Sequence, residues 1–313
     1  MGQKVILIAD PGIDTAFAIA LALLDERIDV LALAATAGNV PAFQATVNIH
    51  TLVGQIDPPR WPRLGAAPQV DYEIDGTKLH GTDGLGNANF PEISLHSPPL
   101  SDRLIVDLVK KHPREVTIVC LGPMTVLKSA LSRDPALASQ IQRLICLGGA
   151  WRESGNATAA AEFHFYCDPE SARDVLRAGI PLTLIPLDVM RKLVFSPSDL
   201  LSLPCPESRV SQFLRKIVPY GIRASSNLYG IEGFHLKDVL GVAAIVLPKA
   251  LTTKPVHADV ETRGELTAGA LVVDTRARPA NKPNVDLATD VDVAAMRQYI
   301  VDTLGQAGGE SII

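Results

Sequence analysis

The sequence contains no block of basic residues and few aromatic side chains. Lys and Arg number 29 against 34 Asp and Glu, which gives a formal net charge of −5 at pH 7. Aromatic residues make up 5% of the chain. Proteins that bind nucleic acids or anionic membranes usually present a basic patch, and single-stranded nucleic acids stack on aromatic rings. We therefore expect no nucleic-acid partner and no membrane partner.

The chain also lacks paired cysteines and long hydrophobic runs. None of its four cysteines belongs to a C-x-x-C pair, and Cys120 and Cys146 lie in apolar runs typical of a buried core. No run reaches the roughly 18 apolar residues that a membrane span needs. The apolar stretch in "MGQKVILIAD" is too short for a signal peptide. A disulfide framework is therefore not expected, and we predict a cytoplasmic protein.

The sequence does contain a regular alternation of short apolar runs and helix-like stretches. Hydrophobic residues make up 47% of the 313 residues, enough for a large core. The apolar runs are continuous, which is typical of parallel strands covered on both faces. We expect strands at 4–9, 29–36, 116–121, 142–148 and 182–187. We expect helices at 14–25, 40–56, 101–111, 124–132 and 169–178. The pattern predicts an α/β fold with an open, mostly parallel, Rossmann-like sheet flanked by helices.

Two segments interrupt the alternation. Residues 66–100 are rich in Gly, Pro, Asp and His, and they predict a long functional loop. Residues 196–246 predict a helical insert before further strands within 257–293 and a final helix at 293–305. Because no repeat or linker is evident, we expect one domain over 1–313.

Polar or glycine-rich segments follow each of the expected strands. The first strand is followed by Asp10-Pro11-Gly12-Ile13-Asp14, and later strands lead to Asn39, Thr125 and Asp188. A lone Asp after a strand is usually a helix cap, but ligands of open α/β sheets bind beyond the carboxyl ends of the strands. Paired carboxylates suit Ca²⁺, Mg²⁺ or the hydroxyls of a sugar. No zinc-ligand spacing, phosphate-binding loop or G-x-S-x-G motif competes with this interpretation.

The chain resembles the inosine-uridine-preferring nucleoside hydrolases. Its motifs occur in the family's order, from the first strand nearly to the end of the chain. The motifs are "DPGID" at 10–14, "AGN" at 37–39, "HGTDGLG" at 80–86, "LGPMT" at 121–125, "GGA" at 148–150, "GNATAAAEFHFYCDPESA" at 155–172, "LDVMRK" at 187–192, "LKDVLGVAA" at 236–244 and "VETRGELTAG" at 260–269.

The resemblance implies hydrolysis of the N-glycosidic bond of ribonucleosides to ribose and free base, at a bound Ca²⁺ that holds the attacking water. It implies that Asp10 is a calcium ligand and the general base, with the Thr125 carbonyl and the Asp238 carboxylate as further ligands. It also implies a homodimer or homotetramer. The residues that it assigns to the ribose hydroxyls are Asp14, Asn39, Asn156 and Glu162. His80, in the "HGTDGLG" motif, is a further substrate-binding candidate, with an ordinary loop residue as the alternative, and the same alternative holds for Asp83.

The first departure from the family pattern is Thr15, which stands where the D-P-G-x-D-D motif has a calcium-ligand Asp. A Thr hydroxyl offers a neutral oxygen, and calcium affinity follows the charge of the ligands. We therefore expect weaker calcium binding at Thr15. The alternatives are an attenuated or non-catalytic nucleoside or ribose binder, and a hydrolase of another glycosidic bond with a different metal arrangement.

The other departures concern the leaving group and the ribose. Purine-preferring members carry His directly before the last calcium Asp, whereas Lys237 precedes Asp238 here and His235 lies three residues before it. Lys237 and His235 are both candidates for the catalytic acid, with a structural Lys as the alternative. His164 replaces the Asn of the family's E-F-N motif and is expected to contact a ribose hydroxyl. Candidates for contact with the base are Tyr220, Arg223 and Tyr229.

Overall fold

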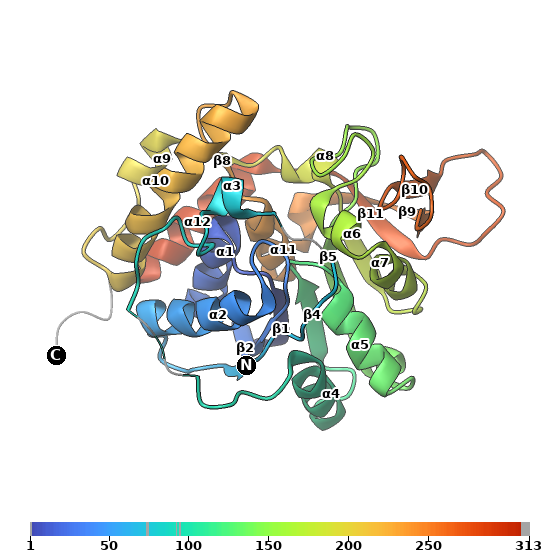
Figure 1. Cartoon of the computed structure of the whole chain (residues 1–313), viewed down its shortest axis with the longest axis horizontal. Helices are drawn as coiled ribbons and strands as arrows, with labels where there is room; N and C mark the ends of the chain where they lie inside the picture. Colours follow the sequence, from blue (N-terminus) through green and yellow to red (C-terminus); the bar gives the residue numbers. More distant parts are fainter. Residues whose placement is uncertain (1, 73–74, 92, 94, 308–313) are drawn as a thin grey trace.

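The structure is a computed structural model that describes residues 2–72, 75–91, 93 and 95–307. In this part of the chain nine strands form one sheet with helices on both faces (Figure 1). The strands are β1 (Gln3–Ala9), β2 (Ile28–Ala35), β3 (Arg63–Gly65), β4 (Val116–Cys120), β5 (Arg143–Leu147), β6 (Leu182–Ile185), β9 (Leu251–Val260), β10 (Leu271–Asp274) and β11 (Val285–Val291). Their order across the sheet is β10-β9-β11-β6-β5-β4-β1-β2-β3.

The sheet is mostly parallel, as the continuous apolar runs predict. In the centre, β1 pairs in parallel with β2 on one side and β4 on the other, so that Leu7 lies opposite both Leu33 and Val119. All five residues of β4 are buried. Antiparallel pairing is confined to one edge, where β9 pairs with β11 and β10. The α/β fold class is therefore confirmed.

The expected helices between the strands are present with shifts of a few residues at their ends. They are α1 (Ile13–Leu24), α2 (Ala42–Ile56), α4 (Ser101–Lys111), α5 (Thr125–Arg133), α7 (Pro169–Leu176) and the final α12 (Val293–Gln306). Shorter segments are α3 (Thr77–His80), α6 (Phe163–Cys167), α8 (Leu187–Met190), α9 (Pro197–Leu201), the β7 (Val194–Phe195) and β8 (Phe234–His235) ribbon, and the 3₁₀ helices η1 (Leu137–Gln140) and η2 (Pro248–Ala250). None of the helices in the described ranges is long and apolar enough to cross a membrane.

The expected helical insert at 196–246 divides into two parts with different roles. The first part, α9 with α10 (Arg209–Tyr229), projects at one side of the molecule (Figure 1). The second part, α11 (Lys237–Val246), is buried over most of its length and belongs to the core. The segment is helical as predicted, and its second part is buried because a nearly all-apolar helix must be covered on every side.

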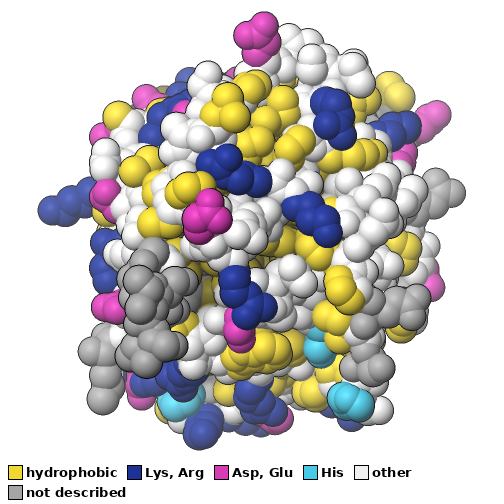
Figure 2. All heavy atoms as spheres, turned by 90° about the vertical axis from the view of Figure 1, so that its left-hand side faces the viewer, with side chains coloured by type: hydrophobic (Ala, Val, Ile, Leu, Met, Phe, Trp, Pro, Cys, Tyr) yellow, Lys and Arg dark blue, Asp and Glu magenta, His cyan; other side chains and the backbone are white. Residues whose placement is uncertain are grey.

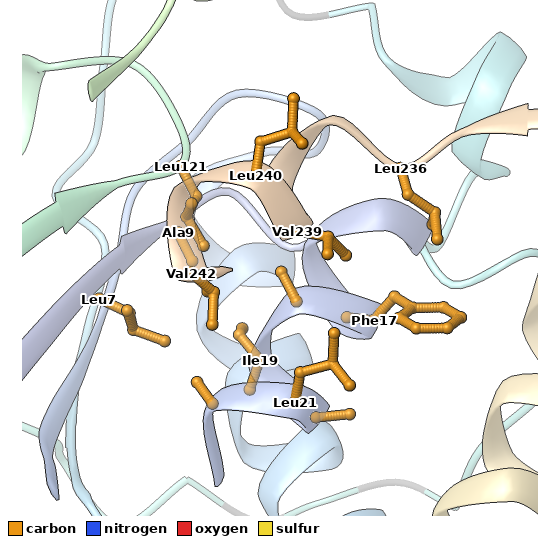
Figure 3. Close-up of a cluster of buried hydrophobic side chains, with 14 of the residues drawn as sticks. Leu7, Ala9, Phe17, Ile19, Leu21, Leu121, Leu236, Val239, Leu240 and Val242 are labelled. Atoms are coloured by element: carbon orange, nitrogen blue, oxygen red, sulfur yellow. The ribbon is translucent and has the colours of Figure 1, made fainter. Parts of the chain in front are cut away.

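Helices α1 and α11 pack against each other beside β1. Phe17 and Ile19 of α1 lie in one apolar cluster with Val239 and Val242 of α11, next to Leu7 of β1 (Figure 3). Asp14 stands in the first turn of α1, and Lys237 begins α11. The Nζ atom of Lys237 lies 3.9 Å from Oδ2 of Asp14, so this packing brings the two helix N-termini together.

The order of the strands reverses between β1 and β4. The chain runs from β1 through β2 to β3 toward one edge, and from β4 through β5 to β6 toward the other. Such a switch point opens a crevice outside the carboxyl ends of the two central strands, where open α/β sheets bind ligands. The motifs "DPGID" and "LGPMT" follow these two strands.

The side of the molecule that carries α9 and α10 exposes side chains of different chemical character. Figure 2 shows this face, on which Lys and Arg side chains are interspersed with hydrophobic ones. Leu201 of α9 and Leu228 of α10 are both exposed. The homodimer or homotetramer implied by the family resemblance stays a prediction.

Candidate active site

The carboxylate of Asp10 lies at the switch point and is fully buried. The backbone N–H of Asn39 donates to its Oδ2 at 3.0 Å, and the Asn39 side chain donates to the Asp10 carbonyl at 2.9 Å. A Cβ on Gly38 would lie 2.1 Å from Oδ2, and one on Gly122 would lie 2.9 Å from Oδ1. Glycine at these two motif positions therefore leaves the room that the carboxylate needs.

Three more side chains at the first turns of α1 and α11 complete the floor of the site. Asp14, Thr15 and Asp238 are all buried. Burial raises the pKa of Asp10 and of Asp238, and for Asp238 the nearby Asp14 charge adds to this effect. Among the described residues, Oδ1 of Asp10, Oδ1 of Asp14 and Oγ1 of Thr15 have no hydrogen-bond partner. The two carboxylate oxygens are acceptors without donors, and the Thr15 hydroxyl can both donate and accept, which suits a ligand with hydroxyl groups.

Glu162 and Asn156 line the site and also shape its wall. Glu162 is the N-cap of α6, and its Oε2 accepts from the backbone N–H groups of Gly149, His164 and Phe165 at 3.1, 3.0 and 3.3 Å. The Asn156 side-chain oxygen accepts from the Phe163 N–H at 2.8 Å. Both side chains are thus fixed by the backbone around them.

The imidazole of His164 lies between two carboxylates. Its Nε2 is 3.6 Å from Oδ2 of Asp10, and its Nδ1 is 3.8 Å from Oε1 of Glu162 and 3.4 Å from the Leu147 carbonyl oxygen. Burial by itself lowers the pKa of His164, but the charges of Glu162 and Asp10 outweigh it and raise the pKa to about 10. His164 is therefore an imidazolium at neutral pH.

The ammonium of Lys237 lies beside Asp14, as described above. Burial alone lowers the pKa of Lys237, but the charges of Asp14, Asp238 and Glu162 outweigh it, so the pKa is raised. Lys237 therefore keeps its proton in the site.

His80 is a neutral histidine in the same cavity. The Ile13 N–H donates to its Nδ1 at 3.0 Å, so this nitrogen carries no proton. Burial lowers the pKa of His80 to about 4. The 3.9 Å separation between Nδ1 and Oδ1 of Asp14 is therefore not an ion pair at neutral pH.

Nine of the residues that the sequence singled out line one polar cavity. They are Asp14, Asn39, His80, Asn156, Glu162, His164, Tyr229, Lys237 and Asp238. A second, more apolar cavity adjoins it and shares Leu79, Asn156, Tyr229 and Lys237 with it. We call these the inner cavity and the outer cavity.

The outer cavity contains the second candidate for the catalytic acid. His235 lines it together with Phe234, Ile231 and Arg191. Burial and then the charges of Lys237 and Arg191 lower the pKa of His235 to about 4, so its imidazole is neutral. Lys237 lines both cavities.

Other residues singled out from the sequence lie outside the two cavities. The Thr125 hydroxyl donates to Oδ2 of Asp168 at 2.7 Å, and Thr125 lines neither cavity. Oδ1 of Asp83 accepts from two backbone N–H groups of its own loop, and Asp188 accepts from those of Trp151 and Arg152. Of the three candidates for contact with the base, only Tyr229 reaches the cavities, whereas Tyr220 packs against the core.

Sequence reasoning missed the residues that give the outer cavity its apolar character. Leu79, Ile231 and Phe234 come from α3, the turn after α10, and β8. Arg191 does lie in the "LDVMRK" motif, which was a usable signal. The others carry none, because an apolar residue in a short segment looks the same in the sequence whether it faces a cavity or the core.

The calcium ligands that the family resemblance implies include only two acidic side chains, Asp10 and Asp238, and the calcium site stays a prediction. Among the described residues, no group of three or more His, Cys, Asp or Glu side chains is arranged to hold a metal ion. Calcium takes six to eight oxygen ligands, and anionic ones raise its affinity. Here Thr15 contributes a neutral oxygen, and the His164 ring lies next to Asp10.

The fold and the site define an α/β enzyme with a carboxylate-lined cavity at the switch point of its sheet. Residues 5–298 match the family model described as inosine-uridine preferring nucleoside hydrolase. The chain belongs to this family, which confirms the resemblance, and it is a hydrolase acting on N-glycosyl compounds.

Similar proteins of this family cover nearly the whole chain. The chain is 32% identical to the non-specific ribonucleoside hydrolase RihC of Escherichia coli O1:K1 / APEC over 310 residues, which are 98% of this chain and 100% of that protein. Among solved structures, the plant nucleoside hydrolase PpNRh1 has a TM-score of 0.88 and 29% identity, covering 97% of this chain and 99% of its own. The purine-preferring ribonucleoside hydrolase from Gardnerella vaginalis has a TM-score of 0.90 and 25% identity, with the same coverage.

Proposed function

We propose that this protein hydrolyses the N-glycosidic bond of ribonucleosides and releases ribose and the free base. The observation that carries the proposal is the pair of joined cavities with different chemistry. Carboxylates and amides line the inner cavity, whereas Tyr229, Phe234 and Ile231 line the outer one. A ribonucleoside has the same division into a hydroxyl-rich sugar and a flat base. The names of the relatives, which act on ribonucleosides, support this substrate class.

The inner cavity binds the ribose in this proposal. Asp14, Asn39, Asn156 and Glu162 present oxygen and amide groups to its hydroxyls. Glycoside hydrolysis passes through a transition state with positive charge on the sugar ring, as in an oxocarbenium ion. The fixed carboxylates around the ring stabilise that charge more than they stabilise the neutral substrate.

Asp10 acts as the general base on the attacking water. Its Oδ2 is held by the Asn39 N–H, while its Oδ1 has no partner among the described residues and is free to accept a proton. A buried carboxylate with a raised pKa is a better base than an exposed one, because catalysis is most efficient when the pKa approaches the working pH. The calcium-bound water implied by the family resemblance stays a prediction, and no step here depends on it.

Lys237 assists the departing base. It lies at the boundary of the two cavities, where the bond between sugar and base would be placed. A charged ammonium at this point donates a hydrogen bond or a proton to a ring atom of the base as the bond breaks. His235 is neutral and lines the outer cavity, so it is placed to bind the base rather than to protonate it.

The test is ribose release from a panel of purine and pyrimidine ribonucleosides, measured with added calcium and with a chelator. We expect release from at least one nucleoside and loss of release in the Asp10→Asn variant. A folded protein that releases no ribose from any nucleoside under either condition would overturn the proposal.

The second candidate function is a nucleoside or ribose binder without turnover, which the loss of an acidic side chain at Thr15 favours. Calorimetry with the same nucleosides separates the two functions. Binding without ribose release identifies the binder, and binding with release identifies the enzyme.

A further inference from the structure

We propose that Arg191 is a specificity residue of the outer cavity, and that it favours ribonucleosides whose base carries a carboxylate. The proposal rests on the proposed function, which places the base in this cavity, and it names the class of base. It adds no chemical step, because it concerns how the base is bound and not how the glycosidic bond breaks. The observation that carries it is a guanidinium in a cavity wall whose described residues include no acidic side chain.

The two cavities differ in the sign of their charged side chains. Several carboxylates line the inner cavity, whereas the described residues that line the outer one include Arg191 and Lys237 but no Asp or Glu. The Lys237 ammonium lies 3.9 Å from Oδ2 of Asp14, which belongs to the inner cavity. Arg191 is therefore the cation that serves the outer cavity alone. A negatively charged group on the base meets an opposite charge in this wall.

Arg191 stands where the chain leaves α8 and turns toward the β7–β8 ribbon. It is the C-cap of α8, and its backbone N–H donates to the carbonyl of Leu187, which also lines the outer cavity. The charge of its side chain acts within the cavity, because it adds to burial and to the Lys237 charge in lowering the pKa of His235. The backbone of the wall thus holds Arg191 beside the space proposed for the base.

The guanidinium of Arg191 has donors available for a ligand. Its Nη1 donates to Oε2 of Glu153 at 2.8 Å, and this is its one side-chain hydrogen bond within the described ranges. A guanidinium has five N–H donors in a planar fork that matches the two oxygens of a carboxylate. The side chains of Arg191 and Glu153 are 34% and 43% exposed, so water weakens this ion pair. A carboxylate on the base can therefore share Arg191 with Glu153 or displace it.

The apolar residues of the outer cavity favour a charged partner for Arg191 over a neutral one. Leu79, Ile231 and Phe234 line the same cavity, so a bound base would leave little water beside the guanidinium. Interactions between charges are stronger where water is excluded, and hydrogen bonds between ionised groups are stronger than those between neutral groups. We therefore expect a carboxylate to be bound more tightly than an amide of the same shape.

Two matched pairs of ribonucleosides test the proposal by their binding. The first pair is 5-carboxyuridine and 5-carbamoyluridine, and the second is the riboside of 6-carboxypurine and that of 6-carbamoylpurine. The dissociation constants are measured by calorimetry in the Asp10→Asn background, where the nucleosides are expected to stay intact. In at least one pair we expect the carboxylate to bind at least about tenfold more tightly than the amide. Equal or weaker binding of the carboxylate in both pairs, or no binding of any of the four, would overturn the proposal.

Substitutions of Arg191 and Glu153 in the same background test the assignment to the guanidinium. Arg191→Gln removes the charge but keeps a polar side chain, and we expect it to abolish the preference for the carboxylate. Glu153→Gln removes the competing carboxylate and is expected to keep or increase the preference. The matched control is Arg209→Gln, because Arg209 pairs with Asp57 and lines neither cavity. If Arg191→Gln and Glu153→Gln weakened the binding of all four nucleosides equally, Arg191 would only support the wall and the proposal would be wrong.

Ribose release by the wild-type protein separates this proposal from the proposed function. A protein that releases ribose from nucleosides but binds carboxylate and amide alike keeps the proposed function and overturns the role of Arg191. A protein that prefers the carboxylate through Arg191 but releases no ribose from any nucleoside loses the proposed function and keeps the specificity residue.

Discussion

Nε2 of His164 lies 3.6 Å from Oδ2 of Asp10, and this contact joins the end of β1 to the first turn of α6. The same Oδ2 accepts the Asn39 N–H, so one carboxylate oxygen is fully engaged while the other is free. The orientation of the proposed base is thus set by two neighbours from different parts of the chain. This arrangement makes the site sensitive to single substitutions that do not alter the fold.

Replacing Asp10 by Asn removes the group that accepts the proton of the attacking water. The Asn oxygen can still accept the Asn39 N–H, so the local structure is expected to hold. We expect kcat for ribose release to fall by about 10²–10⁴-fold, the usual contribution of a general base. Asp29→Asn is the control, because Asp29 pairs with Arg60 at the surface. A kcat near the wild-type value in Asp10→Asn would contradict the role of Asp10.

Gly38→Ala tests the close approach of the backbone to the same carboxylate. The new Cβ would lie 2.1 Å from Oδ2 of Asp10, so the carboxylate or the backbone must move. We expect a large loss of activity and a lower free energy of unfolding. The matched control is Gly54→Ala in α2, where a Cβ meets nothing within 4 Å. There we expect a gain of up to about 1 kcal/mol, because Ala favours the helix. Equal effects of the two substitutions would contradict the prediction.

Glu162→Ala is expected to destabilise the protein as well as weaken substrate binding. Its Oε2 accepts three backbone N–H groups, and the substitution leaves these buried donors without an acceptor. We expect a loss of about 2 kcal/mol in the free energy of unfolding, measured with urea. Glu162→Gln keeps one carbonyl oxygen and is expected to retain most of that stability. If Glu162→Gln and Glu162→Ala lower the free energy of unfolding by the same amount, the capping role of Glu162 is wrong.

Lys237→Met separates help to the leaving group from a purely structural role. For a ribonucleoside we expect kcat/KM to fall by about 10²-fold or more, as for other acid catalysts. For a nitrophenyl riboside, whose leaving group needs no proton, we expect a much smaller loss. His235→Gln is the comparison variant, and it is expected to alter KM more than kcat. If Lys237→Met lowered kcat/KM equally on both substrates, Lys237 would have a structural or ribose-binding role instead.

The neutral His80 predicts a pH dependence of stability. The native pKa of about 4 lies below the ordinary 6.5, so between these pH values the unfolded chain binds a proton that the native protein does not. The free energy of unfolding therefore falls as the pH drops through this range. From about pH 7 to pH 5 the loss attributable to His80 is about 2 kcal/mol.

The variant His80→Gln isolates the contribution of His80 to the pH dependence of the free energy of unfolding. A Gln oxygen can accept the Ile13 N–H that His80 accepts at 3.0 Å, and it does not titrate. Urea unfolding at several pH values should show a flatter dependence in the variant than in the wild type. Parallel curves would mean that His80 is already protonated in the native state or is not buried in solution.

The sequence predicted most of the elements that build the site. Continuous apolar runs indicated the central strands, and polar residues directly after them indicated where a ligand would bind. The strand predictions succeeded because a buried parallel strand is a local feature. The family resemblance singled out the motif residues from Asp14 to Asp238, and eight of them line one cavity.

Other features were not readable in the sequence. The helix α11 was assigned to an insert, α3 was hidden in a long loop, and Tyr229 could not be separated from Tyr220. Each of these depends on which distant segment covers a given face. Hydrophobic periodicity indicates that a residue is buried, but it does not indicate which segment of the chain covers it.

The sequence by itself thus determined the class of fold, the family and the candidate site residues, because local patterns and motifs carry this information. Only the tertiary structure decided how their charges are paired. Asp14 and Lys237 are more than 200 positions apart, and Asp10 and His164 more than 150. Their distances follow from the packing of α1 on α11 and from the strand order around β1. That packing places an imidazole and an ammonium among the carboxylates, which no spacing of residues along the chain could reveal.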